Sequence, residues 1–230
     1  MRESVLPRVA GEIVGTALLV GIGTGSIVLA ARVGGIPQWE LAIAWLFAVL
    51  VPIVLFVRVS GAHLNPAVTL GLVASGRIGW AEVPAYLLAQ FAGAFLGSGL
   101  VLLTLGNEAH LGSTLPSTSL GLVFVAEATF TAGLVASVFV LADLGEGPGR
   151  RRLTLPPVVV GVSTYLIGPL TGSSLNPARS IAPAVLSGSF SGLWVYLLAA
   201  PIGALAVAIA WRPRSVDLRD RGPGRESVAH

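Results

Sequence analysis

Long apolar stretches recur along the whole chain and are separated by short polar connections. Six of them cover residues 9–31, 40–59, 83–105, 120–142, 154–170 and 193–211. Each approaches the roughly 20 residues that an α-helix needs to cross the hydrocarbon core of a bilayer. The pattern therefore predicts six membrane-spanning helices in an all-α integral membrane protein.

Two short segments interrupt this pattern in the same way. An Asn-Pro pair stands at Asn65-Pro66 in "SGAHLNPAVTLGLV", and a second stands at Asn176-Pro177 in "TGSSLNPARSIAPAV". Asn is a favoured N-cap and Pro is favoured at the first helical position, so each pair predicts a helix start. The apolar segments that follow are far too short to span a bilayer, so each predicts a half-helix.

The two halves of the chain form a tandem repeat. "GEIVGTALLV" at residues 11–20 aligns with "AEATFTAGLV" at 126–135 and matches Glu12 to Glu127. Asn65 follows Glu12 by 53 residues, and Asn176 follows Glu127 by 49. Each half has three spans, an odd number, so the second repeat has the opposite orientation in the membrane. In such inverted repeats, solute-binding sites form near the midplane from broken helices. We predict one channel-like domain over residues 1–211, with repeats at 8–105 and 120–211.

The composition agrees with a membrane protein and excludes a soluble globular domain. Hydrophobic residues make up 54% of the chain and charged residues 11%. Cysteine is absent, which excludes disulfides and thiolate metal sites. We expect no metal and no cofactor. The sequence shows no set of nucleophile and base residues, so we do not expect an enzyme.

The basic residues follow membrane topology rather than a nucleic-acid-binding face. All 14 are arginines, and with the N-terminus inside, the outer connections receive only Arg32 and Arg179. This positive-inside bias predicts that both termini are cytoplasmic. The Arg-rich tail at 212–230 has no apolar face and is expected to be disordered or to lie at lipid headgroups.

The segments beside the Asn-Pro pairs predict a polar path. Two helix starts that face each other expose N–H groups and positive dipole ends, which favour a neutral solute over a cation or proton. The residues just before each Asn are not helical, so their carbonyls are free to line the path as acceptors. These residues are Gly61, Ala62 and His63 in the first half and Gly172, Ser173 and Ser174 in the second.

The sequence resembles the aquaporin, or major intrinsic protein, family over residues 8–211. The motifs that carry the resemblance are the two triplets Asn65-Pro66-Ala67 and Asn176-Pro177-Ala178, followed by Arg179. The resemblance implies a homotetramer in which each subunit has its own pore of six helices and two half-helices. It also favours Glu12 and Glu127 as carboxylates that accept N–H groups of the re-entrant loops, rather than as proton-coupling groups.

His63, beside the first triplet, is open to two interpretations. It is a proton sensor in one, and in the other, which we favour, it is a neutral residue packed by the pore.

The resemblance also assigns a selectivity filter. Its positions fall on Trp45, Thr164, Ser173 and Arg179. Strict water channels resemble one another in having Phe at the position of Trp45 and His at the position of Thr164. In having Trp at the first of these positions, this chain resembles glycerol facilitators and nodulin-like channels. In having Ser180 after Arg179, in contrast, the chain resembles water channels, because glycerol facilitators usually have Asp at that position.

We expect a passive plasma-membrane channel for water and small uncharged solutes, with glycerol-like polyols or undissociated metalloid acids as candidates. The alternative is a strict water channel. A remote alternative is an ion-coupled secondary transporter, since inverted repeats and broken helices occur there too.

Overall fold

The computed structural model describes residues 5–143 and 155–211. The long helices of the first half are α1 (Val5–Arg32), α2 (Gln38–Ser60) and α4 (Val83–Leu105), and those of the second are α5 (Leu120–Asp143), α6 (Leu155–Thr171) and α8 (Leu193–Ala210). Two short helices, α3 (Pro66–Ala74) and α7 (Pro177–Ser187), follow the Asn-Pro pairs, and the 3₁₀ helices η1 (Trp80–Glu82) and η2 (Glu108–Gly112) lie in connections.

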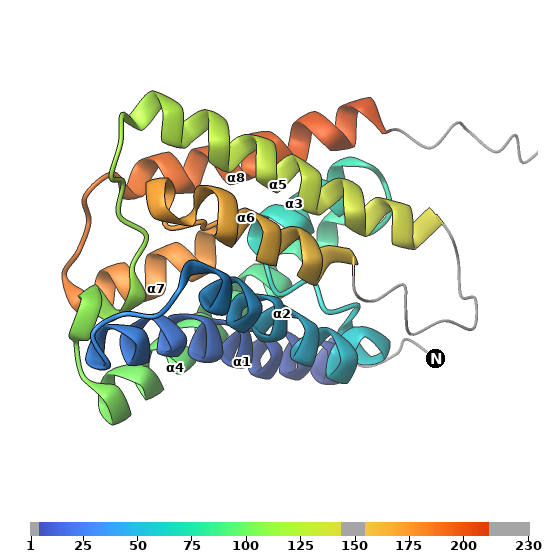
Figure 1. Cartoon of the computed structure of the whole chain (residues 1–230). Helices are drawn as coiled ribbons and strands as arrows, with labels where there is room; N and C mark the ends of the chain where they lie inside the picture. Colours follow the sequence, from blue (N-terminus) through green and yellow to red (C-terminus); the bar gives the residue numbers. More distant parts are fainter. Residues whose placement is uncertain (1–4, 144–154, 212–230) are drawn as a thin grey trace, which may run out of the picture.

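The long helices form a bundle around the two short ones. In Figure 1, α1 and α4 make one side, α5 and α8 the opposite side, and α2 and α6 lie between them. The contacts have the symmetry of the repeat, because α1 packs on α4 as α5 packs on α8. The half-helices follow the same rule, since α3 contacts α8 and α7 contacts α4.

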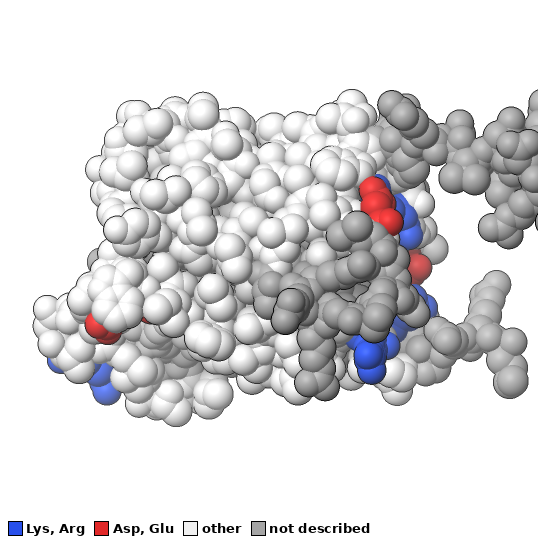
Figure 2. Space-filling model, turned by 45° about the vertical axis from the view of Figure 1, so that its right-hand side comes forward, with Lys and Arg blue, Asp and Glu red and all other residues white. Residues whose placement is uncertain are grey.

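The six predicted spans correspond to α1, α2, α4, α5, α6 and α8. Five of the apolar helices have at least 18 residues, and α6 has 17. Large apolar side chains cover the outside of the bundle, and Leu103 and Leu88 are 86% and 72% exposed. On the face shown in Figure 2, charged side chains gather at the two ends and leave an uncharged belt between them. This surface suits a lipid environment.

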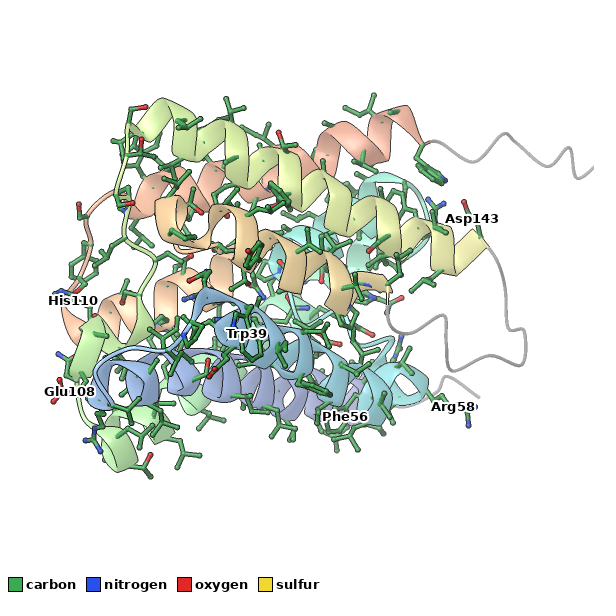
Figure 3. All side chains as sticks on the ribbon, viewed as in Figure 1. Trp39, Phe56, Arg58, Glu108, His110 and Asp143 are labelled. Atoms are coloured by element: carbon green, nitrogen blue, oxygen red, sulfur yellow. The ribbon has the colours of Figure 1, made fainter. Side chains whose placement is uncertain are left out.

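The two half-helices start in the middle of the bundle and end at opposite ends of it. Figure 3 places Arg58 and Asp143 at one end, the Arg58 end, and Glu108 and His110 at the other, the His110 end. Arg77, just after α3, forms an ion pair with Asp143 at 2.7 Å. Ser189 follows α7, and its Oγ lies 3.0 Å from Nδ1 of His110. The predicted opposite entry of the two half-helices is thus present.

Glycines allow the main helix pairs to approach closely. A Cβ at Gly93 of α4 would lie 2.3 Å from the carbonyl oxygen of Ile13 in α1. The equivalent Gly203 of α8 faces the carbonyl oxygen of Ala128 in α5, which a Cβ would approach to 2.1 Å. Small residues at such contacts are typical of membrane helices, which gain stability from close packing. Both contacts lie one residue after the paired glutamates Glu12 and Glu127.

Two Arg-rich segments that the positive-inside pattern assigns to the cytoplasmic side lie outside the described residues. These are the arginines at positions 150, 151 and 152, between the two repeats, and the tail at 212–230.

We predict that Gly93→Ala and Gly203→Ala destabilise the protein, because each added methyl group meets a backbone oxygen that side-chain rotation cannot move. Overpacking of this kind costs about 1–3 kcal/mol. The measurement is thermal unfolding in detergent. Gly99→Ala on α4 is the control, since a Cβ there meets nothing within 4 Å. Equal melting temperatures for all three variants would contradict the close-approach argument.

Candidate functional site

Both Asn side chains cap the half-helices as the sequence predicts. The Oδ1 atom of Asn65 accepts the N–H of Ala67 at 2.8 Å, with Pro66 at the first helical position. The Oδ1 atom of Asn176 accepts the N–H groups of Ala178 at 3.0 Å and Arg179 at 3.3 Å. Each cap satisfies part of a helix terminus that is buried at the centre of the molecule.

The remaining amide groups join the two halves. The Nδ2 atom of Asn65 donates to the carbonyl oxygen of Leu175 at 2.8 Å, and that of Asn176 donates to the carbonyl oxygen of Leu64 at 2.9 Å. An amide nitrogen has two N–H groups, so each Asn keeps one further donor. Both residues line the central cavity, where that donor can meet a solute.

The loops before the caps have an unusual backbone conformation. Ala62 and Leu64 have φ values of 49° and 55°, and the equivalent Ser173 and Leu175 have 45° and 53°. A left-handed conformation costs a residue with a Cβ roughly 1–2 kcal/mol. Such a conformation persists only where its surroundings over-determine it.

Two buried glutamates hold these loops. Glu12 is fully buried, and its carboxylate accepts the N–H groups of His63 at 2.9 Å and Leu64 at 2.8 Å. Glu127, also fully buried, accepts the N–H groups of Ser174 at 2.9 Å and Leu175 at 2.9 Å. Hydrogen bonds to a charged group contribute about 1.5–3 kcal/mol each, enough to offset the strained backbone.

Hydroxyl groups complete this arrangement. The N–H of Ala62 donates to Oγ of Ser60 at 3.1 Å, and that of Ser173 donates to Oγ1 of Thr171 at 3.0 Å. Glu12 also accepts two side-chain donors, Oγ of Ser60 at 2.7 Å and Nε2 of Gln90 at 2.8 Å. The N–H groups of the loops therefore point away from the path.

The carbonyl oxygens of Leu64 and Leu175 accept the Asn amides, but those of the three residues before each Leu are left without protein donors in the part of the chain that the structure describes. Over residues 5–143 and 155–211, no hydrogen bond reaches the carbonyl oxygens of the six predicted acceptors. Gly61, Ala62, His63 and Ser174 line the cavity, whereas Gly172 and Ser173 are not among its lining residues.

One cavity of about 1360 Å³ connects these features. Its lining runs from Arg58 and Asp143 at the Arg58 end, past Asn65 and Asn176, to Trp45 and Arg179. Most of the wall is apolar side chains of the surrounding helices. The polar groups between the two ends include the loop residues and the two Asn amides, and charged side chains lie at the ends, with Arg58, Arg77 and Asp143 at one and Arg179 at the other. A small solute therefore meets hydrogen-bonding groups along one side of a largely apolar wall.

Arg179 lines this cavity and is fully buried beside η2. Its Nη1 donates to the carbonyl oxygen of Gly112 at 2.8 Å, and its guanidinium carbon lies 4.6 Å from the centre of the Trp45 ring. Within the described part of the chain, its Nε and Nη2 atoms have no hydrogen-bond partner. A buried guanidinium with unused donors is suited to an oxygen atom of a passing solute.

The other two predicted filter residues are buried nearby without lining the cavity. Oγ1 of Thr164 has no partner among the described residues, and its carbonyl oxygen accepts Nε2 of Gln38 at 2.6 Å. Oγ of Ser173 lies 2.8 Å from Oγ of Ser163. Ser180 contacts Ser174 and Thr114 through its hydroxyl, so it holds the loop rather than facing a solute.

His63 lies beside the path on the first loop. Its Nδ1 is 3.2 Å from Oγ1 of Thr69, and its ring packs on Tyr86 with 4.6 Å between ring centres. The structure therefore places it in packed, hydrogen-bonded surroundings.

Two tyrosines have a part in the site that the sequence analysis missed. The hydroxyl of Tyr86 donates to the carbonyl oxygen of Ser60, and that of Tyr196 donates to the carbonyl oxygen of Thr171, both at 2.7 Å. These carbonyls end the helices that lead into the two loops. The repeated string Tyr-Leu-Leu-Ala at residues 86–89 and 196–199 is the signal that could have found them.

These features define a class of protein: a multi-pass membrane channel, whose path for small neutral solutes passes between two half-helices. The comparisons with known proteins agree. The major intrinsic protein family matches residues 2–211.

Two plant proteins and one solved structure illustrate the similarity. The chain is 36% identical to aquaporin NIP1-1 of Zea mays, over 90% of this chain and 74% of that protein. It is 35% identical to nodulin-26 of Glycine max, over 88% of this chain and 76% of that protein. The X-ray structure of the aquaglyceroporin from Plasmodium falciparum has a TM-score of 0.80 at 27% identity, and the match covers 94% of this chain and 99% of that one.

The chain belongs to the major intrinsic protein family. It is accordingly a passive channel for water and small neutral solutes and not an enzyme.

We predict that Tyr86→Phe and Tyr196→Phe each lower the stability of the protein, because the variant leaves a buried helix-end carbonyl without its donor. A loss of about 1–3 kcal/mol is expected for each. Thermal unfolding in detergent measures it, with Tyr165→Phe as the control because Tyr165 is 55% exposed on the outer surface. If the three variants lose the same stability, the two hydroxyls do not support the loops.

Proposed function

We propose that this channel conducts glycerol-sized polyols and undissociated metalloid acids as well as water. The observation that carries the proposal is the pairing of Trp45 with Arg179 in the lining of the cavity. The indole offers an apolar wall to a carbon backbone, while Nε and Nη2 of Arg179 have no partner among the described residues. Oγ1 of Thr164 is a further unused polar group nearby.

We assign the filter to Trp45, Thr164, Ser173 and Arg179. A small residue at position 164 leaves room for a solute wider than water, and Ser173 adds a hydroxyl. The similarity to an aquaglyceroporin and to nodulin-26 supports this solute class without identifying one solute.

The pore centre and its supports have separate roles in this proposal. Asn65 and Asn176, with their Pro-Ala partners, present helix N-termini and amide donors that exclude cations and protons. The carbonyls before them accept hydrogen bonds from the solute, and Glu12 and Glu127 hold those carbonyls in place.

We further propose that the protein is a homotetramer in the plasma membrane with both termini cytoplasmic. The arginine distribution supports this orientation, which makes the Arg58 end cytoplasmic. The tetramer rests on membership of the family.

Glycerol flux tests the solute class. Vesicles that contain the protein should take up glycerol faster than protein-free vesicles in a stopped-flow experiment. Thr164→His narrows the filter, so it should lower glycerol permeability about tenfold, equivalent to ~1.4 kcal/mol in barrier height, with a smaller effect on water. Water permeation without glycerol permeation would establish the strict water channel instead, and uptake driven by a proton or sodium gradient would establish a transporter.

Charge at the pore centre tests the exclusion of cations. We predict that Asn65→Asp with Asn176→Asp raises cation conductance, because carboxylates still cap the half-helices but replace the amide donors with negative charge. The measurement is ion conductance in planar bilayers. Asn107→Asp, at an exposed position in an outer connection, is the control. Conductance equal to that of the unmodified protein would count against the electrostatic account.

A further inference from the structure

The ring of Trp45 occupies space that exists because residue 23 has no side chain. A Cβ built on Gly23 would lie 2.5 Å, 2.6 Å and 2.8 Å from three carbons of the Trp45 benzene ring. These are its three nearest neighbours, and all are closer than real Cβ atoms approach other atoms. Gly23 and Trp45 come from different helices, α1 and α2, and both are buried.

We propose that Gly23 is a specificity-determining residue that positions Trp45 against α1 and so sets the width of the filter. The inference rests on the proposed role of Trp45 in selecting solutes. Trp45 is 3% exposed and lines the cavity, so the cavity is the space into which a displaced ring can move. A methyl group at position 23 therefore drives the ring into the path and toward the guanidinium of Arg179, which lies 4.6 Å from the ring centre.

The second repeat has neither a glycine nor a Trp at the equivalent positions, which supports a link between Gly23 and Trp45. Gly23 follows Glu12 by 11 residues, and Val138 follows Glu127 by the same number. Trp45 precedes Asn65 by 20 residues, and Pro156 precedes Asn176 by 20. The pair Gly23 and Trp45 thus corresponds to Val138 and Pro156, and all but Gly23 line the cavity.

A second pair of equivalent positions supports this alignment of the two repeats. Leu19 and Leu134 are equivalent in the two repeats, and both line the cavity. A glycine is therefore not a general requirement of this face of α1 and α5. It is present where a bulky ring crosses in front of the helix.

The experiment measures glycerol and water permeability of vesicles that contain each variant. Gly23→Ala should lower the ratio of glycerol to water permeability about fivefold, because the ring narrows the path more for the wider solute. Gly23→Ala with Trp45→Phe should restore the ratio to that of Trp45→Phe alone, since the smaller ring leaves room for the methyl group. Such coupling is what two residues in contact show in a double-mutant cycle.

Gly25→Ala is the matched control on the same helix. A Cβ at Gly25 would meet only Val101 at 3.5 Å and Leu105 at 3.9 Å, which are ordinary contacts with α4. We expect permeabilities equal to those of the unmodified protein. Variants are compared at equal amounts of folded protein, so a general loss of stability does not imitate a change in the ratio.

The outcomes separate this inference from the proposed function. If Gly23→Ala behaves as Gly25→Ala while the unmodified protein passes glycerol, Gly23 does not position the filter. If the unmodified protein passes no glycerol, the solute class is wrong. Gly23→Ala should then still lower water permeability, and Trp45→Phe should still restore it. A defect that Trp45→Phe does not relieve would also overturn the inference, because it would come from misfolding rather than from the ring.

Discussion

The site depends on a carboxylate buried inside the bundle that accepts the N–H groups of a re-entrant loop. A loop at membrane depth needs all of its N–H groups satisfied, because lipid offers no partners. Glu12 and Glu127 each satisfy two successive N–H groups, and a nearby hydroxyl satisfies the one before them. With these N–H groups bonded to the protein, the carbonyl oxygens of the same loop residues are left free for a solute, and several of these residues have a left-handed backbone.

The helix contacts around Glu12 and Glu127 also help to hold the re-entrant loops. Gly93 and Gly203 bring α4 and α8 against the residues that follow Glu12 and Glu127. In the first half this contact also brings Gln90, one turn before Gly93, to the Glu12 carboxylate. An ionised carboxylate in a protein interior is costly unless donors surround it. Close helix packing therefore stabilises the loops through the carboxylates, not through direct contact alone.

Most of the fold could be predicted from the sequence because its signals are local. Apolar length fixes the spans, and Asn-Pro fixes the starts of α3 and α7 within the chain. The hydrogen bonds from Asn65 to the Leu175 carbonyl and from Asn176 to the Leu64 carbonyl could not be predicted from local pattern, because they join residues more than 100 positions apart. The tyrosine bonds also join different helices, and local pattern does not show which helices pack together, although a repeated string marks both residues.

The filter assignment stays a prediction. The family resemblance placed Trp45, Thr164, Ser173 and Arg179 together; Trp45 and Arg179 line the cavity, and Thr164 and Ser173 are buried and are not among its lining residues. The dimensions of the path also depend on residues that no filter motif includes, since Gly23 determines where the Trp45 ring can lie. Because the repeat supplies the framework of both halves, differences between the halves, such as Gly23 and Trp45 against Val138 and Pro156, are where selectivity can reside. In the arrangement that we propose, the width of the filter is set in part by Gly23, which is not among the residues that line the cavity.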